Sequence, residues 1–375
     1  MKIVIAPDSF KESLSALEVA DAIAEGWQKV IPDTECICIP MADGGEGTVQ
    51  SLIDATHGRW LSVDVTAPLG NTVRAEFGIS GDGKTAIIEM AAASGLHLVP
   101  IEKRNPLITT SYGTGELIKA ALDQGVAKII LGIGGSATND AGAGMLQALG
   151  AVFWDQDGVA LGFGGGALIN TAHVDFSKLD PRLQQVELDV ACDVNNPLCG
   201  EKGASAIFGP QKGASPEMVA TLDKALHHFA TVIQQQHGLD IRHHAGAGAA
   251  GGMGGGLHAF LDAQLKPGIE LLLETLDFAE KIKDADLLIT GEGKSDRQTL
   301  MGKVPSGILQ EARRQHIPVI LLAGAIEDAG ILNAAGFRGV FSITPSPVSL
   351  EQAMQPEFAQ ENIRRTVEQI CRIFF

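Results

Sequence analysis

The two ends of this chain carry the same alternation of short apolar runs and helical patterns. Residues 2–6 form a short apolar run, and a helical pattern separates it from a second run at 35–41. Towards the C-terminus, runs at 286–290 and 319–323 flank a helical pattern at 305–315. Alternating strands and helices of this length are typical of a parallel sheet covered by helices. The two chain ends are therefore expected to build one parallel α/β domain.

The middle of the chain has a different texture. Residues 72–80 and 85–90 are joined by Gly81-Asp82-Gly83-Lys84, which favours a β-hairpin and hence an antiparallel pair. Apolar runs at 128–133 and 186–191 follow, each ending in a loop. We therefore expect an α/β fold of two domains. One is Rossmann- or flavodoxin-like with a parallel sheet, formed by residues 1–65 plus 285–375, and the other is a mixed-sheet α/β domain, residues 66–284, inserted into it.

Two helices carry recognisable start signals. Ser15 and Glu18 have the spacing of a capping box. Ser215 and Pro216 predict the start of a long helix whose end is marked by Gly238.

Charge and composition exclude several classes of protein. The formal net charge is −17 over 375 residues, and since nucleic-acid binders need a basic surface, no nucleic-acid partner is expected. The five cysteines are odd in number and form no CxxC pair, so neither a disulfide framework nor a zinc site is expected. The longest apolar stretch is too short to span a bilayer, and no secretory signal pattern is present. We expect a cytoplasmic protein with no membrane partner.

The strongest local signal is the glycine-rich segment 132–140, which follows an apolar run and precedes a helical pattern. Glycines let the backbone approach an anion, and a helix N-terminus offers free N–H donors. We expect this loop to bind phosphate or carboxylate; the alternative is a tight turn whose glycines only permit close packing. The candidate residues are Gly134, Gly135, Ser136, Thr138 and Asn139.

The same loop also fits a dinucleotide-binding fingerprint. Residues 132–137 match GxGxxA, and Asp155 lies 23 residues after Gly132, where a ribose-binding acid would stand. This keeps a nicotinamide-dependent oxidoreductase of hydroxy acids open as an alternative. Residues 246–251 match GxGxxG too, but no strand precedes them, and we expect a flexible loop or an interdomain element there.

The segment 290–296 contains Gly-Lys-Ser but is not a Walker P-loop, because position 288 is Leu288 where the motif needs glycine. What remains is a loop after a strand with acidic groups and a nearby lysine; a solvated charged turn is the alternative. The candidates are Gly291, Glu292, Asp296 and Lys303.

Three more loops follow predicted strands and carry acidic groups. In parallel α/β sheets, ligands bind outside the carboxyl ends of the strands, so acids there are candidates for Mg²⁺ binding or base catalysis. Each alone is more often a turn former or a helix cap. The candidates are Asp8, Ser9 and Lys11 in the first loop, Asp43 and Glu46 in the second, and Asp193 in the third.

At these loops the sequence resembles the bacterial glycerate kinase family, the type 1 glycerate 2-kinases that lack a P-loop. The resemblance runs over essentially the whole chain, and so many matches in order are far more specific than any single glycine motif. The matching segments are residues 5–11, 40–48, 112–116, 133–143, Asp193 with Asn196-Pro197, 208–214, 246–252, 290–293, Asp296, 298–300 and Gly302-Lys303.

The resemblance implies ATP-dependent phosphorylation of D-glycerate, with Mg²⁺ and with ADP as the co-product. It favours the 2-hydroxyl as the acceptor and hence 2-phosphoglycerate; 3-phosphoglycerate is the alternative product. The pathway would be the breakdown of glyoxylate, glycolate or glucarate. It also implies two α/β domains, one Rossmann- or flavodoxin-like and the other inserted.

Phosphoryl transfer needs alignment and neutralisation of charge, and the acidity of this chain makes the second requirement acute. We expect Lys11 and Lys303 to offset charge on the phosphates or on the glycerate carboxylate. Asp43 and Glu46 would position Mg²⁺, and Asp193 would accept the hydroxyl proton, with Asp8 and Asp296 as alternates for either role.

A monomer or small homo-oligomer is expected. Besides the oxidoreductase, a nucleotide-sensing protein without catalysis is an alternative.

Overall fold

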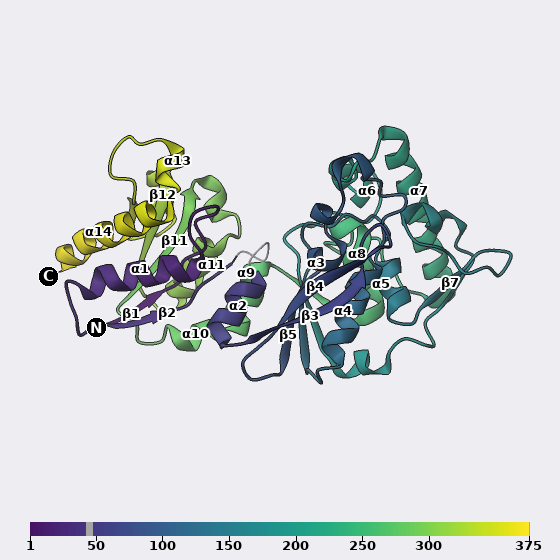
Figure 1. The fold of residues 1–375 in the computed structure, drawn as a ribbon, viewed down its shortest axis with the longest axis horizontal. Helices are drawn as coiled ribbons and strands as arrows, with labels where there is room; N and C mark the ends of the chain where they lie inside the picture. Colours follow the sequence, from purple (N-terminus) through teal and green to yellow (C-terminus); the bar gives the residue numbers. More distant parts are fainter. Residues whose placement is uncertain (43–47, 375) are drawn as a thin grey trace. The chain divides into compact units, whose positions relative to one another are not determined.

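The computed structural model describes residues 1–42 and 48–374. They form two compact units (Figure 1). The first unit takes in the described residues of Met1–Asp43, Gln50–Thr56 and Ile269–Phe375, and the second those of Gly44–Val49 and His57–Gly268. The domain bounds expected from the sequence, residues 1–65 plus 285–375 and residues 66–284, stay a prediction.

The first unit is built on a five-stranded sheet in the order β13-β12-β11-β1-β2. All neighbours pair in parallel. Counted along this unit alone, the order is 2-1-3-4-5, the flavodoxin-like order, in which a ligand binds where the strand order reverses. That reversal lies between β1 and β11. The strands are β1 (Lys2–Ile5), β2 (Glu35–Cys38), β11 (Leu287–Ser295), β12 (Val319–Ile326) and β13 (Gly339–Ser342).

Helices α1 (Ala16–Gln28) and α14 (Pro356–Phe374) lie side by side in the first unit (Figure 1). The predicted capping box of α1 is confirmed: Ser15 accepts from the Glu18 amide, and Glu18 in turn accepts from the Ser15 amide. The other helices here are α2 (Thr48–Thr56), α9 (Gly268–Thr275), α10 (Phe278–Lys281), α11 (Val304–Arg314), α12 (Ala329–Ala334) and α13 (Leu350–Ala353), with a 3₁₀ segment at Arg297–Leu300.

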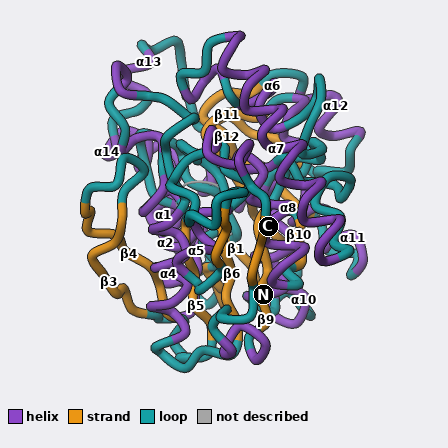
Figure 2. The backbone as a smooth tube through the Cα atoms, turned by 90° about the vertical axis from the view of Figure 1, so that its right-hand side faces the viewer, coloured by secondary structure: helices purple, strands orange, loops and turns teal. Residues whose placement is uncertain are grey.

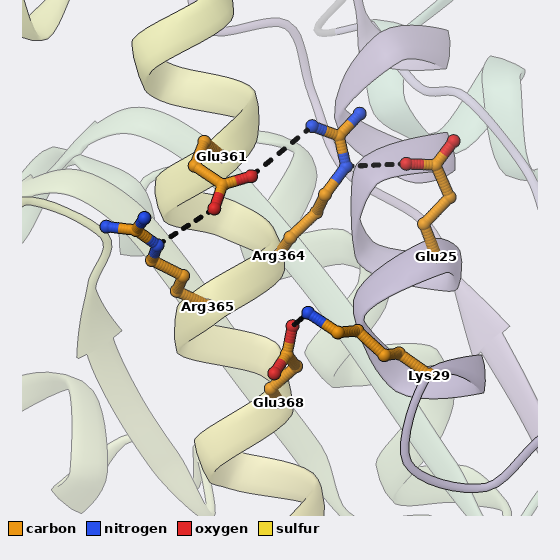
Figure 3. Close-up of polar contacts among 6 residues, drawn as sticks. All are labelled: Glu25, Lys29, Glu361, Arg364, Arg365 and Glu368. Atoms are coloured by element: carbon orange, nitrogen blue, oxygen red, sulfur yellow. Dashed lines mark hydrogen bonds and ion pairs between the residues drawn. The ribbon is translucent and has the colours of Figure 1, made fainter.

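The seam between α1 and α14 is close because α1 carries a glycine there. A Cβ at Gly26 would lie 2.7 Å from the carbonyl oxygen of Arg364. Ion pairs flank the seam (Figure 3), with Arg364 Nε 2.5 Å from Glu25 Oε2 and Lys29 Nζ 2.5 Å from Glu368 Oε1. Because such surface pairs contribute little, the buried apolar side chains beneath them carry most of the packing energy.

The second unit has a six-stranded mixed sheet in the order β10-β9-β6-β5-β4-β3. Strands β3, β4 and β5 pair antiparallel, and the hairpin predicted around residues 81–84 is confirmed. Figure 2 shows β3 and β4 as long neighbouring strands. From β5 onward the pairs are parallel. The strands are β3 (Arg59–Thr66), β4 (Thr72–Ile79), β5 (Thr85–Glu89), β6 (Lys128–Gly132), β9 (Glu187–Ala191) and β10 (Gln264–Lys266).

The predicted long helix is α7 (Pro216–His237), capped by Ser215 and ended by Gly238 in a left-handed conformation. A small antiparallel pair lies outside the main sheet, β7 (Val152–Trp154) with β8 (His173–Asp175). The remaining helices are α3 (Ala91–Ser94), α4 (Tyr112–Leu122), α5 (Ala143–Ala148), α6 (Ala204–Phe208) and α8 (Ala249–Leu261), and 3₁₀ segments lie at Leu96–Leu98, Ile101–Lys103, Gly165–Asn170, Pro181–Gln185 and Pro210–Lys212.

The expected fold class, one parallel and one mixed-sheet α/β unit with the second inserted into the first, is confirmed. Within the described part of the chain, no helix is both long enough and apolar enough to cross a membrane.

Candidate active site

At the reversal point of the first sheet, the loop after β1 is hydrogen-bonded to strand β11. The loop after β1 joins β11 through the Asp8 amide, which donates to the Gly291 carbonyl at 2.8 Å. On the other side of β11, a Cβ at Gly291 would lie 2.8 Å from the Leu322 carbonyl oxygen. The close approach of β11 and β12 at this point therefore requires a glycine at position 291.

A cavity of about 820 Å³ opens at this point and runs past the carboxyl ends of β1, β11, β12 and β13. One end is polar. Its walls include five residues that the sequence singled out as candidates, and the structure brings them together although they come from both ends of the chain: Asp8, Ser9, Lys11, Glu292 and Lys303.

Glu292 is the buried acid of this polar end. Its Oε1 accepts hydrogen bonds from Thr299 Oγ1 at 2.5 Å and Ser295 Oγ at 3.0 Å. Burial raises the pKa of the Glu292 carboxyl, while these hydroxyls and Lys303 act in the opposite direction. Lys303 Nζ lies 3.8 Å from Glu292 Oε2 and directly precedes α11. A fixed positive charge therefore stands at the cavity wall beside the first turn of a helix.

The expectation of a loop at 290–296 was wrong, because residues 290–295 pair with β12 as part of β11. Two other charged residues at the end of this strand have local roles. The Asp296 side chain accepts from the Gln298 amide at 2.7 Å and so caps the 3₁₀ segment Arg297–Leu300. Asp296 is not among the residues that line the cavity. Lys294 does line it, but its ammonium is paired with Glu327 at 2.8 Å.

In the second unit, the glycine-rich loop after β6 does not open a helix as expected. Helix α5 begins only at Ala143, seven residues after Ser136. The intervening chain is held by Asp140, whose carboxylate accepts from the Ser111, Gly142 and Gly144 amides. Gly134 and Gly135 are exposed, whereas Ser136, Thr138 and Asn139 are buried. The loop thus presents glycine backbone to the outside and folds its polar side chains inward.

A buried lysine that is not among the residues predicted from the sequence, Lys212, holds this loop in place. Lys212 Nζ donates to Ser136 Oγ at 2.7 Å and to the Thr138 carbonyl at 2.6 Å. Burial lowers the pKa of the Lys212 ammonium to about 7, against the opposing effect of Asp140. Lys212 lies inside the segment 208–214 that carries the family resemblance, and this was the only signal for it in the sequence.

The second glycine-rich segment is also accounted for by packing, which corrects the expectation of a flexible or interdomain loop. Residues 249–256 are helical in α8, apart from a left-handed kink at 250–252, and almost all are buried. A Cβ at Gly251 would lie 2.0 Å from the Thr138 carbonyl oxygen, and one at Gly256 would lie 2.4 Å from that of Ala141. The glycines of this segment therefore let it pack against the backbone of the first glycine-rich loop.

Asp193 follows β9 at the same sheet edge as the glycine-rich loop, because β6 and β9 are parallel neighbours. Its Oδ1 accepts from the Gly268 amide, the first residue of α9, at 3.0 Å. The structure thus gives this carboxylate a structural partner at the start of a helix.

Metal ligands were expected at Asp43 and Glu46, which lie outside the described residues. Among residues 1–42 and 48–374, no group of three His, Cys, Asp or Glu side chains could hold a metal ion. Within the polar end of the cavity, Asp8 and Glu292 are the acids.

The dinucleotide-binding alternative loses its geometric basis. Asp155 follows β7, which pairs with β8 and not with the main sheet. The Asp155 carboxylate accepts from the amides of Asp157 and Val159, closing a tight turn. A ribose-binding acid would instead stand at the end of the strand next to β6 in a parallel sheet.

Comparisons with known proteins agree with one another. Residues 3–375 match the model of the family described as "Glycerate kinase family". A glycerate kinase of Haemophilus influenzae is 58% identical over 374 residues, covering 100% of this chain and 98% of the relative. A glycerate 2-kinase of Escherichia coli K12 is 55% identical over 372 residues, covering 99% and 97%. A crystal structure described as glycerate kinase 2 from Salmonella typhimurium LT2 is similar with a TM-score of 0.92 at 53% identity, covering 100% and 98% of the two chains.

Proposed function

Since the chain belongs to the glycerate kinase family, and is therefore a phosphotransferase that acts on an alcohol group, we propose that it transfers the γ-phosphate of ATP to the 2-hydroxyl of D-glycerate. The products are 2-phosphoglycerate and ADP. The choice of the 2-hydroxyl is supported by the relative from Escherichia coli, which is named a glycerate 2-kinase. The alternative product is 3-phosphoglycerate.

The observation that carries the proposal is the polar end of the cavity in the first unit. Lys11 and Lys303 line the same cavity although they come from the two ends of the chain. In a protein of net charge −17, a triphosphate needs such local positive charge. The position also agrees with the rule that ligands of doubly wound sheets bind at the point where the strand order reverses. We place the β- and γ-phosphates there.

Mg²⁺ fits this end of the cavity chemically. The ion is typically bound by one or two carboxylates together with phosphate oxygens and water, and Asp8 lines the same cavity as the two lysines. Bound Mg²⁺ would neutralise phosphate charge during the transfer. Asp43 and Glu46 remain our proposed further ligands.

The second unit supplies our proposed groups for the acceptor. The exposed backbone of Gly134 and Gly135 can approach the glycerate carboxylate without steric hindrance, since a Cβ at Gly134 would meet nothing within 4 Å. Ser136, Thr138 and Asn139 are buried, and we propose that they support this loop. Asp193, at the same sheet edge, is our candidate to accept the hydroxyl proton.

The test of the function is glycerate-dependent release of ADP, with the product passed to enolase. Immediate consumption by enolase indicates 2-phosphoglycerate, and consumption only after addition of a phosphoglycerate mutase indicates the 3-isomer. A protein that binds ATP but releases no ADP when D-glycerate is added would be a nucleotide sensor, and the proposal would fail. Breakdown of glyoxylate, glycolate or glucarate as the pathway, the cytoplasmic location and the state as a monomer or small homo-oligomer stay predictions.

A further inference from the structure

The cavity of the first unit changes character along its length. Its polar end lies at β1 and β11, and the opposite end lies beyond β12 and β13, against α13 and the start of α14. Figure 1 shows α13 and α14 in yellow next to β12. Neighbouring strands are about 4.8 Å apart, so β13 and β1, three spacings apart, are separated by roughly 14 Å. The cavity is therefore long enough to hold a base at one end and phosphate groups at the other.

The end away from the lysines is lined by apolar side chains: Ile343, Val348, Leu350, Ala353, Met354 and Phe358. Leu350 is 74% exposed, although it is a large apolar residue at the rim of a cavity. Apolar surface left open around a concave site is a feature of ligand pockets, whose walls are mostly apolar with a few polar groups that fix orientation. A flat, largely apolar ring would cover this surface.

Three polar residues also line this part of the cavity, and two of them, Ser342 and Thr344, donate their hydroxyls to the Gly324 carbonyl. The third, Asn362 of α14, is only 5% exposed. Its side-chain amide forms no hydrogen bond with another described residue, and its nitrogen and oxygen are not sealed from the cavity. A primary amide offers two donors and one acceptor. The Asn362 amide is therefore available to a polar group of a ligand in the cavity.

We propose that the apolar end of the cavity binds the adenine base of the nucleotide and that the Asn362 amide selects adenine over guanine. The proposal deepens the proposed function and rests on it for the identity of the phosphate donor. Adenine presents an acceptor at N7 beside a donor at its 6-amino group, which an amide matches with one donor and one acceptor. Guanine presents two acceptors at that edge and leaves the amide carbonyl unpaired.

The first test compares ATP with GTP as phosphate donors. The Asn362→Leu variant keeps the size of the side chain and removes both amide groups, so we expect the ratio of kcat/KM for ATP over GTP to fall about tenfold while kcat with ATP changes little. The matched control is Gln369→Leu, which removes an exposed amide on the same helix away from the cavity. An unchanged ratio in Asn362→Leu, or a wild-type protein that uses ATP and GTP equally well, would overturn the proposal.

A second variant probes the apolar wall without risk to folding. Leu350→Gln makes the exposed rim polar and should raise the KM for ATP severalfold while leaving the KM for D-glycerate unchanged. Ile373→Gln on α14, at a residue that is 77% exposed, should change neither. Equal effects of Leu350→Gln on both KM values, or none on either, would contradict the assignment of the base to this wall.

Binding of adenosine, measured by calorimetry, tests the base site separately from the proposed kinase function. Adenosine has no phosphate and should bind to the wild type and more weakly to Asn362→Leu. If adenosine binds in this way but no ADP is released on addition of D-glycerate, the base site stands and the proposed function fails. If ADP is released but adenosine does not compete with ATP, the function stands and the base site fails.

Discussion

Lys303 Nζ lies 3.8 Å from Glu292 Oε2 at the polar end of the cavity in the first unit. The acid is buried and the lysine is about one-third exposed. The carboxylate is also fixed by Thr299 and Ser295. The pair thus holds an ammonium group at the point where the strand order of the sheet reverses, and it leads to two predictions, one for each residue.

Replacing Lys303 by Met should remove this ammonium group, which is also the counter-charge of Glu292, and keep most of the length of the side chain. Because a positioned charge on a transferring phosphate is worth on the order of 10²-fold in rate, we expect kcat/KM for ATP to fall about 100-fold. The control is Lys283→Met in the same unit, at a lysine whose side chain is 63% exposed and paired with Glu280. Steady-state kinetics of both variants measure the effect. A Lys303→Met protein as active as the control would show that Lys303 is only a surface charge.

The buried Glu292 predicts a specific pH dependence of stability. The pKa of the Glu292 carboxyl is raised in the folded protein above the ordinary 4.5. At pH values just above 4.5, the native state therefore binds more protons than the unfolded chain. The free energy of unfolding falls as the pH rises from 4.5 through the pKa of the folded state. Glu292→Gln stays neutral and should lose this dependence. Its Tm relative to wild type should therefore be higher at about pH 8 than at about pH 4. Glu280→Gln, at a side chain that is 68% exposed, should follow wild type throughout. The reverse trend in Glu292→Gln would contradict the burial effect.

Lys212 should matter for the stability of the second unit. Lys212→Met leaves Ser136 Oγ and the Thr138 carbonyl without their buried donor, and an unsatisfied buried group costs about 1–3 kcal/mol. We expect a loss of unfolding free energy in that range. Lys202→Met, at an exposed position of the same unit, should change it by less than about 0.5 kcal/mol. Urea denaturation measures both. Equal stability of the two variants would mean that Lys212 does not hold the loop.

The contact between α1 and α14 offers a test of packing. Gly26→Ala would place a methyl group 2.7 Å from the Arg364 carbonyl oxygen, and overpacking of this kind costs about 1–3 kcal/mol. Gly330→Ala makes the same change where a Cβ meets nothing within 4 Å, and it should be neutral or slightly stabilising. Thermal unfolding compares the two. Since α14 also carries Asn362, we expect Gly26→Ala to weaken ATP binding as well. A Gly26→Ala protein with the same Tm as wild type would indicate that α1 and α14 can move apart without loss of stability.

Much of the fold could be predicted from local pattern. The alternation at the chain ends, the hairpin around residues 81–84 and the capping signals at Ser15 and Ser215 all act over a few residues, and each is confirmed. The expectation that a helix begins directly at the glycine-rich loop was wrong. The Asp140 carboxylate holds the chain before α5 in a non-helical path through its contact with Ser111, 29 residues away in the sequence. No local pattern encodes such a contact.

The candidate site shows the same division. Strand-end loops pointed to Asp8, Lys11, Glu292 and Lys303, since the order of a parallel sheet brings strand ends together. Lys212 was missed because its acceptors, Ser136 and Thr138, are more than 70 residues distant in the chain. Asn362 did leave a signal, as a polar residue on the apolar stripe of α14 beside Ala359 and Ile363. The sequence alone does not show that this position faces a cavity, and the structure does.

The most direct measurement is a crystal structure of the protein grown with a non-hydrolysable ATP analogue, Mg²⁺ and D-glycerate. We expect density for the triphosphate within hydrogen-bond distance of Lys11 and Lys303, and for the base against Asn362 and Leu350. A triphosphate bound to the glycine-rich loop after β6, with the cavity at the ends of β1 and β11 holding no part of the nucleotide, would contradict it.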